Sequence, residues 1–150
     1  MRELQQQHAE TANIIVERAT ANLPQATQAA LFTVTGRILL TQIVGEVTTA
    51  IQLQTTNLKL ISNPTVGADV DICSLLNISG DAVGTLYNIT GTLADALIGT
   101  TSGAFKAQAD PIVIAAGTID LDTDDDSSTG QTKWTIHYIP LDSNSIVVTA

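Results

Sequence analysis

The chain has 150 residues, a length typical of one domain, and its 15 acidic and 6 basic residues give a net charge of −9. The basic residues are scattered singly, which disfavours binding to nucleic acid or to an anionic membrane, because clustered lysine and arginine bind both. The longest apolar runs have about five residues, far short of the ~20 that cross a bilayer, and the N-terminus lacks the apolar core of a cleaved signal.

The N-terminal segment is rich in glutamate, glutamine, alanine and leucine and lacks glycine and proline, which favours a helix. Leu4 and Ile15 recur near one face at helical spacing. We predict an amphipathic helix over residues 3–20, within a helical arm and linker at residues 1–28. Its apolar stripe is too narrow to fold alone, so it is expected to pack against a partner. The predicted interaction residues are Leu4, Ile14, Ile15 and Val16.

From about residue 29 the chain is rich in threonine, valine, isoleucine, leucine and glycine. β-Branched residues, period-two alternation and turn residues about every ten positions predict a mainly β fold, an antiparallel β-sandwich or barrel over residues 29–150. The segment 92–105 fits either a short helix or an open loop. The predicted core consists of Leu39, Ile51, Leu53, Leu58, Leu60, Ile72, Leu86, Ile89, Val113, Ile119, Leu121, Trp134, Ile136 and Val147.

Acidic residues are dense in one segment, IDLDTDDDSSTG. Alternating carboxylates on a turn can supply oxygen ligands to a hard cation such as calcium. An EF-hand loop starting at Asp120 is excluded, because its sixth position is Asp125 rather than glycine. The favoured interpretation is a solvated acidic hairpin tip, and a weak divalent-cation site is the alternative. The candidate metal ligands are Asp120, Asp122, Asp124 and Asp126.

Residue types that often act in catalysis are sparse. Cys73, the single cysteine, lies between apolar neighbours and is predicted to be buried. His137 alternates with apolar residues, which predicts that it lies on the polar face of its strand, and His8 is expected to pack within the predicted helix. The sequence contains no nucleophile elbow, phosphate-binding glycine loop or HExxH motif. We therefore predict no catalytic residues, no cofactor and no enzyme activity.

Four elements carry a family resemblance: GEVTTAIQ at 45–52, LISNPTVGADVDIC at 60–73, SGDAVGTLY at 79–87 and KWTIHYIPL at 133–141. Together they resemble small β-rich virion proteins encoded among the head genes of tailed bacteriophages, over about residues 29–140. The resemblance implies capsid decoration, or cement: a homotrimer that binds the major capsid protein on the outer shell and bridges neighbouring capsomers. It also implies localisation on the virion after synthesis in the host cytoplasm.

A second function class uses the same β architecture. A phage fibre head or lectin-like receptor-binding module would normally expose tryptophan or tyrosine for stacking on sugars, and only Trp134, Tyr87 and Tyr138 are present. A threonine-rich surface with few lysines suits a shell protein, because few long side chains must be immobilised at its contacts.

Overall fold

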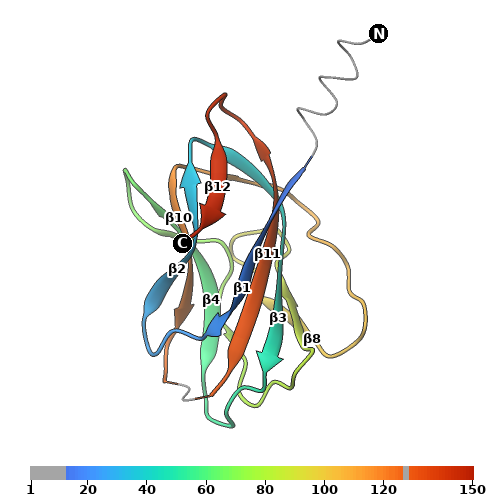
Figure 1. The fold of residues 1–150 in the computed structure, drawn as a ribbon. Coiled ribbons are helices and arrows are strands. Elements are labelled where there is room, and N and C mark those ends of the chain that lie inside the picture. Colours follow the sequence, from blue (N-terminus) through green and yellow to red (C-terminus); the bar gives the residue numbers. More distant parts are fainter. Residues whose placement is uncertain (1–12, 127–128) are drawn as a thin grey trace.

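The computed structural model describes residues 13–126 and 129–150, which form a sandwich of two antiparallel sheets (Figure 1). The predicted sandwich is thus confirmed. The described residues form neither a barrel nor a helix, and so include no helix that could cross a membrane. The strands are β1 (Ile14–Asn22), β2 (Gln28–Thr35), β3 (Ile38–Thr49), β4 (Asn57–Pro64), β5 (Val70–Asp71), β6 (Leu76–Asn77), β7 (Leu86–Asn88), β8 (Ile98–Thr100), β9 (Ile112–Ile114), β10 (Gly117–Thr123), β11 (Gln131–Pro140) and β12 (Ile146–Thr149).

The two sides of the sandwich are built differently. The first has the strand order β1-β11-β3-β7-β8, with β9 also pairing with β3. The second has the order β12-β2-β10-β4-β5, with β6 also pairing with β4. On one side, a parallel bridge between Ser74 and Ala96 joins the segments next to the short strands. On the other side, β1 and β12 are the terminal strands of their sheets and lie next to each other.

Alternation along β11 places every second side chain in the core, and Trp134 lies at its centre. The Trp134 ring is fully buried and stacks on Tyr87 of β7, with ring centroids 6.1 Å apart and an interplanar angle of 17°. The indole N–H donates to Thr132 Oγ1 at 3.0 Å, which satisfies the one polar atom of the ring. The Tyr138 hydroxyl accepts a hydrogen bond from the Val147 amide at 3.2 Å, so β11 is tied to β12 of the other sheet.

The predicted core is largely confirmed, with two errors. Leu53 is 88% exposed, because β3 ends at Thr49 and the alternation does not continue through the following turn. Val113 is 62% exposed, because it points out of β9 between the inward-facing Ile112 and Ile114. Leu39 and Leu86 are half-buried. The buried members are Ile51, Leu58, Leu60, Ile72, Ile89, Ile119, Leu121, Trp134, Ile136 and Val147.

The helix predicted over residues 3–20 is wrong in its described part, where residues 14–22 form β1. The register pairs Ile15 with His137 and Val16 with Ile136 of β11, so successive side chains point to opposite faces. Pairing with β11 overrides the helical propensity of the glutamate, arginine and alanine residues here. Residues 14–22 therefore lie in the same sandwich as the chain from residue 29 onward. Leu4 and His8 lie outside the described residues.

Segment 92–105 contains no helix and is mostly loop around the short strand β8. It connects β7 to the strand pair formed by β9 and β3. This outcome matches the open-loop alternative for the segment.

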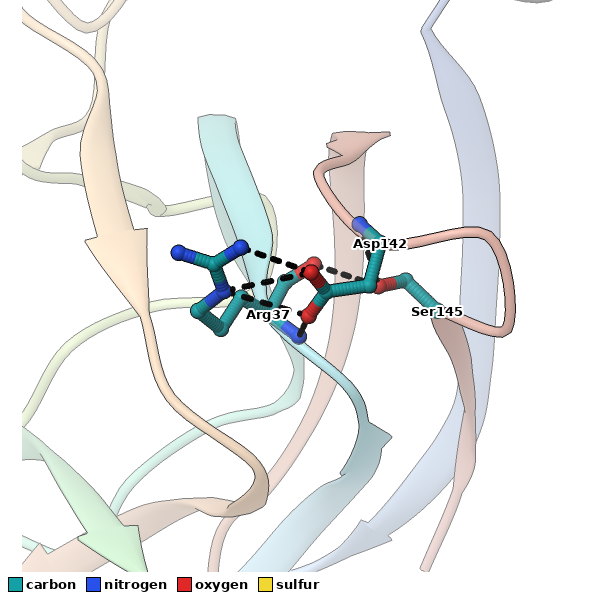
Figure 2. A network of polar contacts seen from close by, with 3 residues as sticks. All are labelled: Arg37, Asp142 and Ser145. Atoms are coloured by element: carbon teal, nitrogen blue, oxygen red, sulfur yellow. Dashed lines mark hydrogen bonds and ion pairs between the residues drawn. The ribbon is translucent and has the colours of Figure 1, made fainter.

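Two turns that cross between the sheets are joined by Arg37 and Asp142 (Figure 2). Arg37, between β2 and β3, donates from its backbone amide, Nε and Nη2 to the Asp142 carboxylate at 2.7–3.3 Å. Ser145, in the turn before β12, donates from Oγ to the Arg37 carbonyl at 2.6 Å. Hydrogen bonds from Arg37 lower the pKa of Asp142 to about 2.

Asp142→Asn is expected to cause a small decrease in melting temperature at pH 7 and a smaller decrease at pH 2. The folded-state pKa lies below the ordinary value of 3.8, so the contribution of the carboxylate to stability is complete above about pH 4 and is lost as the pH falls from about 4 through 2. Thermal melts of both proteins across this range measure the difference. An equal difference at both ends of the range would contradict the assignment.

Candidate functional site

Large apolar side chains are exposed along β1 and β12, which we call the β1/β12 edge. Ile14 and Ile15 are 42% and 61% exposed, and Ile146 and Val148 are 51% and 49% exposed. Ile14 of β1 lies opposite Tyr138 of β11 in the register, and the Tyr138 hydroxyl accepts a hydrogen bond from the Val147 amide of β12. The apolar ends of β1 and β12 are therefore close. Among the described strands β1 pairs only with β11, so its outer side presents backbone N–H and C=O groups to solvent.

Opposite faces of β1 have different roles. Val16 points inward and packs against the core, whereas Ile15 points outward. Arg18 follows on the inner face and lines a cleft with residues 19–21 and the chain end at Thr149 and Ala150. Its Nε is buried and has no hydrogen-bond partner in the described part of the chain. The β1/β12 edge therefore combines exposed apolar surface, free backbone groups and one cation.

The structure separates the four predicted interaction residues. Ile14 and Ile15 are exposed on the edge, Val16 belongs to the packed interior, and Leu4 lies outside the described residues. Ile146 and Val148 were not among the interaction residues predicted from the sequence. A signal for them was present, because a buried Val147 in a strand places both of its neighbours on the opposite face.

The acidic segment is not the predicted hairpin tip, because β10 and β11, which flank it, belong to different sheets. Asp120 and Asp122 lie within β10, and Asp120 is only 3% exposed. Asp124 accepts hydrogen bonds from the side chain and backbone amide of Asn57 at 2.7 and 2.8 Å, which lower its pKa. Asp126 is exposed. In residues 13–126 and 129–150, no group of three or more His, Cys, Asp or Glu is placed to hold a metal ion.

Cys73 and His137 lie where the sequence predicts. His137 is half-buried on the outer face of β11. Cys73 is 1% exposed, and its sulfur accepts a hydrogen bond from the Leu60 amide at 3.3 Å. Burial raises the pKa of the Cys73 thiol to about 11. The thiol is therefore inaccessible and protonated at neutral pH.

Native protein is expected to resist alkylation of Cys73 by iodoacetamide at pH 8, at least about 100-fold relative to denatured protein, since only an accessible thiolate reacts. Mass spectrometry over time, with and without guanidinium, measures both rates. Native labelling at the denatured rate would show that the segment around Cys73 opens readily.

Exposed aromatic residues of the kind that bind sugars do not occur in the described structure. Trp134, Tyr87 and Tyr138 are 0–2% exposed and belong to the core. Comparisons with protein-family models, with curated proteins and with solved structures find no match. The β1/β12 edge and the sequence pattern are therefore the features that bear on function.

Proposed function

We propose that the chain is a structural virion protein of a tailed bacteriophage, a decoration or cement protein without catalytic activity. It binds the major capsid protein on the outer surface of the head and stabilises contacts between capsomers. The observation that carries the proposal is the β1/β12 edge, where four apolar side chains are exposed beside the outer edge of β1, which pairs with no other described strand. The sequence resemblance supports the same role.

Attachment at this edge takes the form of strand addition. An extended segment of the capsid protein pairs with the free backbone groups of β1, while Ile15 and the neighbouring apolar residues supply side-chain contacts. Main-chain hydrogen bonds provide affinity and the alternating side chains provide specificity. The inward-facing Val16 holds β1 in place and makes no contact with the capsid.

Assembly as a homotrimer strengthens such an attachment. One strand edge buries a small area, and linking three edges in one particle raises the effective concentration of the second and third contacts. The three-fold state follows from the resemblance. Light scattering at micromolar concentration should give three times the chain mass of 15.7 kDa, and a monomer mass would remove this part of the proposal.

The alternative of a fibre or lectin-like receptor-binding module gains no support from the surface. The tryptophan and both tyrosines that would stack on a sugar are buried. Binding on a glycan array would favour this alternative over capsid attachment.

The proposal is tested by mixing purified protein with phage heads that lack decoration and then sedimenting the heads. We expect the protein to pellet with the heads at a saturable ratio and to raise the temperature at which they release DNA. Protein that stays in the supernatant at all concentrations would contradict attachment to the capsid.

A further inference from the structure

The outer face of the second sheet buries a carboxylate. Asp120 lies on β10 between Ile119 and Leu121, which face the core, so its own side chain faces away from the core. It is nevertheless only 3% exposed. Asp69, from the segment between β4 and β5, reaches across this face to Gln28 of β2. The carboxylate of Asp120 therefore lies beneath neighbouring side chains rather than in bulk solvent.

Two carboxylates converge on one amide nitrogen in this region. Gln28 Nε2 donates to Asp120 Oδ2 at 2.6 Å and to Asp69 Oδ2 at 3.1 Å. Asn63 of β4 donates from Nδ2 to the same Asp120 oxygen at 3.1 Å. Within residues 13–126 and 129–150, the side-chain donors that hold these two acidic groups close together are thus neutral.

The second oxygen of Asp120 is left without a partner. Within the described residues, Asp120 Oδ1 is buried and accepts no hydrogen bond, and no Lys, Arg or His forms an ion pair with it. Lys59, on the neighbouring strand, pairs instead with Asp71 at 3.0 Å. A buried charge needs a compensating charge, and an unsatisfied buried oxygen indicates a missing water or ion.

The side-chain amides of Gln28 and Asn63 can supply further oxygen ligands. The O and N ends of Gln and Asn are nearly the same size, and a half-turn of each amide directs Gln28 Oε1 and Asn63 Oδ1 to the place that their nitrogens occupy. Asp120 Oδ2 then has an oxygen of each amide beside it, and Asp69 Oδ2 has the Gln28 oxygen beside it. Calcium accepts six to eight such oxygens in flexible geometry, with water completing the shell, whereas magnesium demands a near-ideal octahedron.

We propose that Asp69 and Asp120, together with the side-chain oxygens of Gln28 and Asn63, bind one Ca²⁺ ion on the outer face of the second sheet. The site shares only Asp120 with the acidic segment considered from sequence, and it does not depend on the proposed virion function. The ion joins β2, β4 and β10 to the segment before β5, and so fastens that segment to the sheet.

The test uses the full chain, stripped with a chelator, and two measurements with CaCl₂: a calorimetric titration and a thermal melt. The variants Asp120→Asn and Asp69→Asn each remove one ligand charge. Asp110→Asn removes the same charge at an exposed position and is the matched control. NaCl at equal ionic strength controls for screening of the net charge.

We expect one ion per chain and a rise in melting temperature of about 5–10 °C at roughly 100 times the dissociation constant, for the parent and for Asp110→Asn. Asp120→Asn should lose both signals, and Asp69→Asn should bind at least about tenfold more weakly. Because Asp69 is at the surface of the site, that variant keeps the test decisive if Asp120→Asn fails to fold. Equal calcium effects in all variants, or no binding by the parent, would overturn the proposal.

Discussion

Removing residues 1–22 is expected to lower the free energy of unfolding by about 5 kcal/mol or more, a large part of the total stability of a domain. The deletion removes β1, which pairs with β11 from Ile14 to Asn22 and packs Val16 against the core. Each lost ladder hydrogen bond costs about 1 kcal/mol, and the core residues of β11 become exposed at a new edge. The melting temperature should therefore fall by about 10–20 °C.

Differential scanning calorimetry of the parent and the truncated chain measures this effect. Ile15→Asp is the control, because Ile15 faces solvent on the same strand and its substitution should leave the melting temperature within about 2 °C. An unchanged transition in the truncated chain would show that residues 14–22 are a dispensable arm, as the composition of the segment suggests.

Gly45→Ala is expected to destabilise the fold by about 3 kcal/mol, with a fall in melting temperature of about 6–12 °C. Gly45 of β3 lies opposite Trp134 in the register, and a Cβ added there would come within 2.6 Å of the indole Cη2 atom. The Trp134 indole has little freedom to move away from this Cβ, because it is stacked on Tyr87 and hydrogen-bonded to Thr132. Overpacking of this kind forces strained rotamers or backbone shifts.

Gly103→Ala is the matched control, since a Cβ at Gly103 meets nothing within 4 Å. The double variant Gly45→Ala with Trp134→Leu should be less destabilised than the sum of the single changes, because the smaller side chain removes the clash. Strict additivity, or a Gly45→Ala protein as stable as the parent, would show that the indole has room to move.

The sequence predicts the sandwich because alternation with β-branched residues persists over most of the chain. In β11, Trp134 and Ile136 alternate with polar residues, and one face of that strand is unambiguous. In β9 both faces carry isoleucine or valine, so the pattern could not show that Val113 points outward. The prediction that Leu53 is buried was wrong for another reason, because the alternation does not show where β3 ends.

Residues 14–22 show where local propensity is insufficient. IIVERATAN contains good helix formers, yet its first three residues are β-branched and one edge of the strand pairs with β11. The partner strand is more than a hundred residues away in the chain, so only tertiary pairing decides the outcome. The cluster around Asp120 is hidden for the same reason, since Gln28 and the pair Asn63 and Asp69 come from two segments that are each more than fifty residues before Asp120 in the chain.

The most direct test of the proposed function is sedimentation with undecorated heads of two matched variants, Ile15→Asp and Val113→Asp. Ile15 and Val113 are 61% and 62% exposed, both are β-branched, and they lie on strands at different places in the same sheet. If the β1/β12 edge binds the capsid, Ile15→Asp loses binding by at least about tenfold while its melting temperature stays unchanged, and Val113→Asp binds like the parent. Equal binding by both variants, or equal loss in both, would contradict attachment through this edge.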